Sequence, residues 1–387
     1  MNIAENRTVD ADWAAITVVI FGVTAFSVSQ GLTYPLISLI LAQRGVEAGI
    51  IGLNGAVFAI GVGISTLLIG PITAIMNGHK LIVSALVGVS VSLALFASFD
   101  TLWVWFVARF FLGFSASLIF MTSEAWMNTA CPDRIRGRVS GLFGAGMCAG
   151  FAAGPLAIPL FGMEDGFAFA LLAVYVAFVA FVTVIISRKT HTSPEAAQPG
   201  MFMQFVHAAP LLVAMVLVFG FADIAAISGL PLYFTEMGYS PSFAAVAVTM
   251  LALPTALAQP LFGWLLDKFD RTTVSLGAAL VTAAAFLCLP FLQSQAAIFV
   301  ALAVIGTASF GLYTAALTLL GSRYSGGMLV AGSAAFALAY SVGSATGTVA
   351  FGAAMQMISA QAGPITIGIV VLVFALTFGV ASVRRKP

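Results

Sequence analysis

Long apolar runs constrain the fold of this chain more than any other feature of the sequence. A helix rises about 1.5 Å per residue, so about 20 apolar residues are needed to cross roughly 30 Å of hydrocarbon. With 61% hydrophobic and only 7% charged residues, the chain cannot cover a globular surface in water. We therefore predict an all-α membrane protein with twelve transmembrane helices. The twelve runs lie at residues 13–40, 49–74, 81–99, 102–127, 139–161, 167–187, 208–234, 241–266, 273–292, 296–320, 328–357 and 364–383.

The basic residues predict the orientation of these spans. If both termini are cytoplasmic, 13 of the 15 Lys and Arg residues lie in cytoplasmic segments, whereas Arg44 lies outside and Arg109 within a span. The positive-inside rule requires this bias. We expect a multi-pass protein with both termini in the cytoplasm, and the short loops suit a cell inner membrane. The acidic first twelve residues argue against a cleaved signal peptide.

The longest polar segment of the chain, which carries Arg188 and His191, divides the runs six and six. Polar residues without a helical apolar face are typical of a linker outside the membrane. We therefore predict an N-terminal six-helix bundle at 1–187, a cytoplasmic linker at 188–207 and a C-terminal six-helix bundle at 208–387.

The two predicted bundles share a repeat of glycines. A shift of 193 positions, about half of the 387 residues, pairs five glycines at equivalent places in corresponding spans. The pairs are Gly45 with Gly238, Gly70 with Gly263, Gly113 with Gly306, Gly150 with Gly343, and Gly154 with Gly347. A duplicated unit explains one common offset better than chance matches among 38 glycines. We therefore expect two pseudo-symmetric bundles.

Two short segments resemble motifs of a known family. The loop after the eighth run reads GWLLDKFDR at residues 263–271, and the fourth run contains RFFLG at residues 109–113. The first resembles the signature loop between paired helices of the major facilitator superfamily, and the second is similar to the second motif of that family. Together with the twelve runs and the central linker, the likeness covers nearly the whole chain.

The resemblance implies a cytoplasmic latch. Asp267, Lys268 and Arg271 match the acid and the cations that hold neighbouring helices together in the family and release them when the carrier changes conformation. The corresponding loop of the first bundle departs from the pattern, because Ala74 stands where the acid belongs. A latch is therefore expected in the second bundle.

The fifth run carries a further likeness. Gly150, Gly154 and Pro155 resemble the Gly/Pro motif of the family's proton-coupled exporters, although Ile158 and Pro159 stand where that motif has glycines. The resemblance implies proton antiport. The alternative is a helix-packing role, since Gly-x-x-x-Gly lets two membrane helices approach closely and says nothing about direction.

Three ionisable side chains fall within the spans: Arg109, Glu124 and Asp223. Such groups cost at least ~2.5–3.5 kcal/mol at mid-bilayer, so they usually face a cavity or a partner. Arg109 and Glu124 are 15 residues apart, about 22 Å along a helix, so they cannot pair. Asp223 lies at a depth comparable with Arg109, and in the family both spans line the central cavity. The resemblance thus implies that these two side chains face each other.

We hypothesise that Asp223 accepts a coupling proton and that Arg109 keeps it ionised until the two separate. An opposite charge favours an ionised carboxylate and burial favours the neutral form, so separation would trigger protonation. A permanent structural ion pair is the alternative. Glu124 is either a second protonation site or an interfacial side chain that pairs with Arg134 or Arg138.

Other polar side chains at this depth are candidates for hydrogen bonds to a substrate. Each could equally join two helices, because Ser, Thr and Gln often do so in membranes. The candidates are Gln30, Tyr34, Gln259, Ser309, Tyr313 and Thr314.

These features predict a secondary active transporter that works by alternating access. Proton-coupled export of a small organic or amphipathic compound is our first expectation, and proton-coupled uptake of a small nutrient or metabolite is the alternative. Few fixed charges in the spans argue against a phosphate or polyanion as substrate. The expected partners are a small-molecule substrate, protons and the lipid bilayer, and we expect the protein to act as a monomer.

Other classes of function lack their usual motifs. The sequence contains no His-Glu-x-x-His, nucleotide-binding or metal-ligand spacing, and its three cysteines show no framework. We therefore expect no enzyme, metal, cofactor or nucleic-acid partner. A channel would more naturally show repeated filter loops, which are also absent.

Overall fold

In a computed structural model, residues 11–130, 133–163, 166–188, 190, 202–324 and 326–384 are described. Within these ranges the chain is helical and has no strands, which confirms the predicted all-α membrane class. The elements are α1 (Trp13–Gln43), α2 (Ala48–Ile75), α3 (Gly78–Ser98), α4 (Leu102–Ala130), α5 (Asp133–Ala153), the 3-10 turn η1 (Gly154–Leu156), α6 (Ala157–Phe161), α7 (Phe167–Ser187), α8 (Phe202–Ala208), α9 (Pro210–Glu236), α10 (Pro241–Lys268), α11 (Arg271–Cys288), the 3-10 turn η2 (Leu289–Phe291), α12 (Gln295–Arg323), α13 (Gly326–Met357) and α14 (Ala362–Arg384).

Among the described residues, 11 helices are long and apolar enough to cross a membrane. The fifth predicted run, at 139–161, is the exception. There the chain forms α5, η1 and α6, and the continuously apolar stretch is the shorter segment Gly146–Phe161. The early part of α5 is rich in arginine, and Pro155 and Pro159 each lack the N–H that an uninterrupted helix needs.

Local sequence signals explain where several helices begin and end. The Asp12 carboxylate accepts a hydrogen bond of 3.0 Å from the Ala15 N–H and so caps α1. At the other end of α1 and at the end of α9, Gly45 and Gly238 have φ of +73° and +87°, a conformation that side chains disfavour. These two glycines are one of the pairs at the common offset, so the repeat has a structural counterpart.

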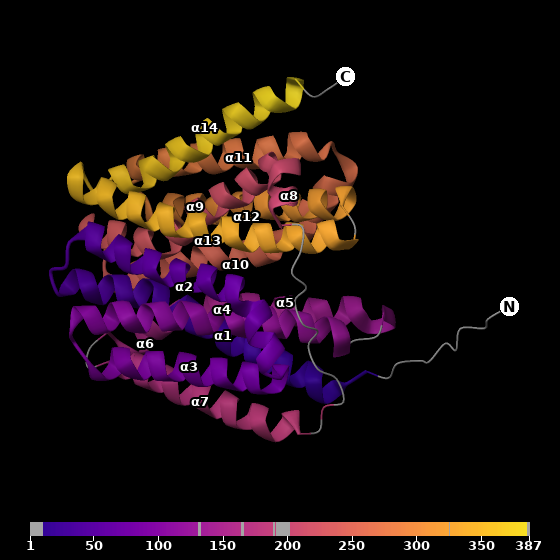
Figure 1. Cartoon of the computed structure of the whole chain (residues 1–387). Helices are drawn as coiled ribbons and strands as arrows, with labels where there is room; N and C mark the ends of the chain where they lie inside the picture. The colour runs from indigo at the N-terminus through magenta and orange to yellow at the C-terminus, as the bar shows by residue number, and fades with distance from the viewer. Residues whose placement is uncertain are drawn as a thin grey trace.

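The helices form two groups that lie side by side, with α1–α7 in one and α9–α14 in the other (Figure 1). Helix α1 begins and α14 ends on the same side of the molecule, which we call the terminal face. The turns that join α1 to α2 and α13 to α14 lie on the opposite side, the distal face. The short helix α8 falls in the segment predicted as a linker and packs against α13.

Close contacts between helices repeat at the same offset of 193 residues. A Cβ added to Gly113 would lie 2.2 Å from the Phe58 carbonyl oxygen, and one added to Gly306 would lie 2.0 Å from that of Leu251. A second pair of glycines shows the same relation: Gly150 faces the Thr24 carbonyl oxygen, and Gly343 faces the Leu217 carbonyl oxygen. In a third pair, Gly154 faces the Val28 carbonyl oxygen and Gly347 faces the Phe221 carbonyl oxygen. Corresponding helix pairs of the two groups therefore pack alike.

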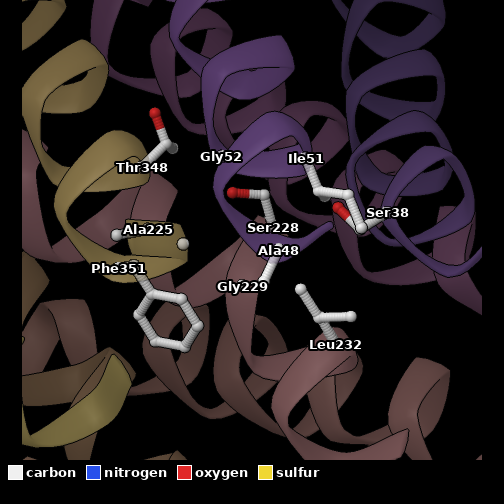
Figure 2. A pocket seen from close by; sticks show the side chains of 11 residues that line it. Ser38, Ala48, Ile51, Gly52, Ala225, Ser228, Gly229, Leu232, Thr348 and Phe351 are labelled. Carbon is white, nitrogen blue, oxygen red and sulfur yellow. The ribbon is translucent and has the colours of Figure 1, made fainter. Parts of the chain in front are cut away.

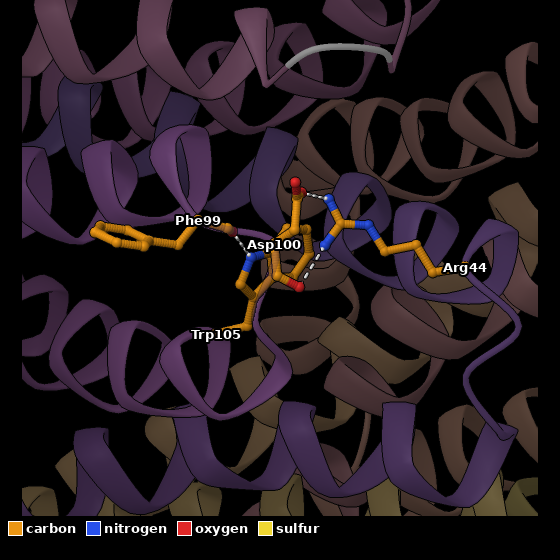
Figure 3. A network of polar contacts seen from close by, with 4 residues as sticks. All are labelled: Arg44, Phe99, Asp100 and Trp105. Carbon is orange, nitrogen blue, oxygen red and sulfur yellow. Dashed lines mark hydrogen bonds and ion pairs between the residues drawn. The ribbon is translucent and has the colours of Figure 1, made fainter.

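Arg44, the basic residue predicted outside the membrane, ties two distal turns together (Figure 3). Its guanidinium forms an ion pair with Asp100, donates to the Asp100 carbonyl over 3.2 Å and lies 4.4 Å from the centre of the Trp105 ring. The Trp105 Nε1–H donates to the Phe99 carbonyl over 2.6 Å. The cluster thus fixes the start of α4 relative to the end of α1.

Candidate functional site

The two groups of helices meet closely along α2 and α13. A Cβ added to Gly52 would lie 2.3 Å from the Thr348 carbonyl oxygen, and one added to Gly352 would lie 2.3 Å from that of Ala48. The Ser341 hydroxyl donates a hydrogen bond to the Ala59 carbonyl. These contacts run from the middle of α13 to its distal end, so the distal face is closed in this conformation.

A small cavity lies within this closed region (Figure 2). Residues of α1, α2, α9 and α13 line it, including Ser38, Ser228 and Thr348. Each of these three hydroxyls bonds to a carbonyl of its own helix. The space is on the order of one water molecule, which excludes it as the site of an organic substrate.

Asp223 lies near the middle of α9 and contacts a tyrosine of α13. The Tyr340 hydroxyl donates a hydrogen bond of 2.9 Å to Asp223 Oδ2. The side chain of Asp223 is half-buried. The Tyr340 ring packs against Phe219, whose ring also stacks on Tyr313 with centroids 4.9 Å apart. The carboxylate therefore has a neutral partner and a wall of aromatic rings beside it.

Arg109 is held between two aromatic rings. Its guanidinium carbon lies 4.8 Å from the centres of both the Tyr34 and the Phe58 rings, and the residue is only 1% exposed. Its Nε and Nη1 have no hydrogen-bond partner among the described residues. Cation–π contact stabilises a guanidinium in such a place, yet the N–H groups of Nε and Nη1 have no partner in the described ranges.

The expected direct pair between Arg109 and Asp223 is not formed in this conformation. Among the described residues no ion pair within 4.0 Å joins them. The Arg109 guanidinium lies against the rings of Tyr34 and Phe58, whereas Asp223 accepts a hydrogen bond from the Tyr340 hydroxyl. Each charge therefore has its own aromatic neighbours.

Glu124 is on α4, nearer the terminal face. Its side chain is exposed, and no hydrogen bond or ion pair joins it to another described residue. The side chains of Arg134 and Arg138, its alternative partners, lie outside the described part.

The structure brings two of the predicted cavity residues together. The Thr314 hydroxyl donates a hydrogen bond of 2.7 Å to Gln259 Oε1, which joins α12 to α10. The Ser309 hydroxyl donates to the Gly306 carbonyl of its own helix over 3.2 Å. Gln30 is 3% exposed, and neither of its amide atoms has a hydrogen-bond partner in the described ranges. Gln30 therefore has unused polar capacity among the described residues.

The predicted latch residues sit at the terminal end of α10 and the start of α11. Lys268 Nζ lies 4.8 Å from the centre of the Trp264 ring, and Arg271 Nε donates to the Leu266 carbonyl over 3.4 Å. Within the described ranges, Asp267 forms no ion pair with either cation. The three residues are thus adjacent, and their role as a latch remains a prediction.

Gly150, Gly154 and Pro155 lie where α5 passes α1. Cβ atoms on the two glycines would lie 3.0 Å from the Thr24 carbonyl oxygen and 2.8 Å from that of Val28. Gly154 and Pro155 are the first two residues of the turn η1. The structure places the motif at a close helix crossing, and its link to proton exchange remains a prediction.

Sequence reasoning missed the partners of the two buried charges. Tyr340 binds Asp223, while Phe58 covers Arg109. Tyr340 is the one tyrosine in a span dominated by Ala, Gly and Ser, which was a signal that could have been used. In the described ranges no group of three or more His, Cys, Asp or Glu residues is placed to hold a metal ion.

Comparisons with known proteins agree with this architecture. The model of the Major Facilitator Superfamily matches residues 19–348 and 235–387. An uncharacterized MFS-type transporter of Bacillus subtilis (strain 168), YfkF, is 28% identical over 346 residues, which is 88% of each chain.

Solved structures show the same fold. The nucleoside transporter NupG superimposes with a TM-score of 0.76 at 13% identity, over 97% of this chain and 100% of that one. A bacterial homolog of the human lysosomal transporter Spinster, in an inward-facing and unoccupied conformation, gives 0.74 at 14% identity over 94% of each chain. The protein is therefore a membrane transporter and not an enzyme, and it belongs to the Major Facilitator Superfamily.

Proposed function

We propose that this protein is a secondary active transporter that exports a small organic or amphipathic compound in exchange for protons. It would act as a monomer in the cell inner membrane, with the terminal face in the cytoplasm. Proton-coupled uptake of a small nutrient or metabolite is the second candidate. The described basic residues support the orientation, since Lys80, Lys268, Arg271, Arg323 and Arg384 lie at helix ends on the terminal face and Arg44 lies on the distal face.

We further propose twelve crossings in two six-helix bundles, 1–187 and 208–387, joined by the segment 188–207. The segment from α5 through α6 would complete the fifth crossing, since together they are long enough for about 30 Å of hydrocarbon. Glycine contacts that recur at one offset support the duplication. In this arrangement the closed distal face faces outward, and the conformation is inward-facing.

The observation that carries proton coupling is the environment of Asp223. The carboxylate lies mid-span, half-buried, and its partner in the described structure is the neutral Tyr340 hydroxyl. A carboxylate in a permanent ion pair has little reason to titrate, whereas one with a neutral partner can bind and release a proton as its exposure to water changes. If the Arg109 guanidinium approaches Asp223 during the transport cycle, it would favour the ionised form of the carboxylate.

The first test is ligand-linked proton exchange by purified protein in weakly buffered detergent solution. Lipophilic compounds and small metabolites would be added to the wild type, Asp223→Asn and Glu124→Gln. Glu236→Gln is the matched control, because Glu236 is an exposed carboxylate at the distal end of α9. We expect proton release that Asp223→Asn abolishes and Glu236→Gln retains. Proton-driven transport that survives Asp223→Asn in proteoliposomes would refute the role of this carboxylate.

Export and uptake differ in the pH gradient that drives accumulation. In everted vesicles, a proton antiporter that exports its substrate accumulates it when the lumen is acidic. A symporter that imports its substrate does not accumulate it in that arrangement. The two candidate functions are thus separated by reversing the gradient in one preparation.

A further inference from the structure

We propose that the small cavity in the contact between the two groups is a hydration site, which holds one water molecule while the distal face is closed. The inference goes beyond the transport function and does not depend on the direction of transport. The cavity is lined from α1, α2, α9 and α13, so both groups contribute to it (Figure 2). Gly52 and Gly352, the glycines that let α2 and α13 touch, both line it. Closure of the distal face therefore forms the walls of the site.

The size of the cavity limits what it can hold. The centre of a water-sized sphere can occupy about 10 Å³ of it, which is close to the smallest space that holds an ordered water molecule in a protein. An organic ligand needs far more room. The remaining occupants are one water molecule or one small ion.

The polar atoms of the lining are hydrogen-bond acceptors. Ser38, Ser228 and Thr348 come from three different helices. Each hydroxyl donates its proton to a carbonyl of its own helix, over 3.1, 2.6 and 3.0 Å, respectively. A hydroxyl whose proton is engaged in this way can still accept a hydrogen bond through its lone pairs. A water molecule, which can donate two hydrogen bonds, complements this lining.

A dry cavity and a bound cation fit the same walls less well. Cavities that stay empty in proteins are apolar, whereas three hydroxyls line this one. A sodium ion would also bind hydroxyl oxygens, but no Asp or Glu is among the lining residues to offset its charge within the membrane. Water is neutral and needs no such partner, so the chemistry of the lining favours water.

A water molecule at this place makes part of the closed contact wet. Beside the cavity α2 and α13 touch directly, since a Cβ added to Gly55 would lie 3.1 Å from Thr348 Cγ2. Contacts through water are nearly as favourable as direct hydrogen bonds. The hydroxyls of Ser38 and Ser228 would thus be hydrated in the open and in the closed conformation. Closure of the distal face then does not have to remove the last water molecule from them, which lowers its cost in free energy.

Radiolytic footprinting with short X-ray pulses tests the inference, because the pulses convert bound water into hydroxyl radicals that oxidise the nearest side chains. Phe351 lines the cavity and is 2% exposed, whereas Phe286 is 0% exposed and is not among the lining residues. In purified wild-type protein we expect oxidation of Phe351 and none of Phe286. Ser228→Ala and Thr348→Val should each lower the oxidation rate of Phe351 several-fold, because the water loses an acceptor. Thr282→Val is the matched control, since it removes a buried hydroxyl with the same kind of helix bond on α11 and should leave the rate unchanged.

Three results would overturn the proposal. Oxidation of Phe351 no faster than that of Phe286 would mean that no water lies beside it. Equal oxidation in the wild type, Ser228→Ala and Thr348→Val would mean that the radicals come from bulk water through an opened face. Higher thermal stability in sodium chloride than in choline chloride, lost in Thr348→Val, would make the cavity a cation site. If either variant does not fold, Ser38→Ala replaces it with the same expected loss of oxidation.

Discussion

Gln356, at the distal end of α13, caps the first turn of α2 in the other group of helices. It also binds Glu47, the residue that precedes α2. Its Oε1 accepts a hydrogen bond of 3.0 Å from the Gly49 N–H, and its Nε2 donates to Glu47 Oε2. Glu47 makes no capping bond of its own to α2. One amide therefore satisfies the Gly49 N–H at the start of α2 across the contact between the two groups.

Gln356→Ala should loosen the closed distal face. The substitution removes two hydrogen bonds, each worth about 0.5–1.5 kcal/mol. The fraction of molecules in which the distal face is open should therefore rise roughly tenfold. A cysteine placed at Ser228, behind the contact, in a background without the native cysteines would report opening by its rate of maleimide labelling. Gln361→Ala, at an exposed position of the next turn, is the control. An unchanged rate would show that the cap does not hold the face closed.

Gly52→Val should prevent closure of the same face. A Cβ at this position would lie 2.3 Å from the Thr348 carbonyl oxygen, so α2 and α13 could not approach as they do here. We expect a folded protein that labels rapidly at Ser228→Cys and does not transport. Gly277→Ala, where a Cβ meets nothing within 4 Å, should be tolerated. Full transport by Gly52→Val would mean that this closed state is not part of the cycle.

The spans and the internal repeat were predictable because they depend on local properties. Apolar length sets where a helix crosses a membrane, and the glycines of the repeat mark sites where backbones approach each other. The fifth run was less predictable, since α5 begins with arginines just before it and Pro155 interrupts it.

The partners of the charged residues were not predictable in the same way. The hydrogen bond between Asp223 and Tyr340 joins residues 117 positions apart, and it depends on how two helices are rotated against each other. Apolar periodicity does not define that rotation in spans that are hydrophobic on every side. The rings around Arg109 were missed for the same reason, and the state of the latch at Asp267 depends on conformation as well as on sequence.

Tyr340→Phe should reveal how strongly the tyrosine and Asp223 are coupled. The substitution keeps the ring beside Phe219 and removes the donor to the carboxylate, a hydrogen bond worth about 1.5–3 kcal/mol when the acceptor is charged. A double-mutant cycle with Asp223→Asn would be measured by thermal unfolding in detergent. The losses of unfolding free energy in the two single mutants should differ from additivity by about this amount. Additive losses would mean that the contact contributes nothing to stability.

Arg109→Lys should fail to replace the arginine although it keeps the charge. A planar guanidinium can lie between the Tyr34 and Phe58 rings at 4.8 Å from each, whereas an ammonium is a compact and strongly hydrated charge that stacks poorly. We expect a loss of stability of about 1–2 kcal/mol from weaker cation–π contact and the burial of a harder ion.

The measurement for Arg109→Lys is thermal unfolding in detergent, with Lys80→Arg as the control at an exposed position on the terminal face. Phe58→Leu should lower the stability of the wild type but have a smaller effect in the Arg109→Lys background, because the ring then covers no guanidinium. If Phe58→Leu costs the same in both backgrounds, the two rings only pack against Arg109 and do not stabilise its charge.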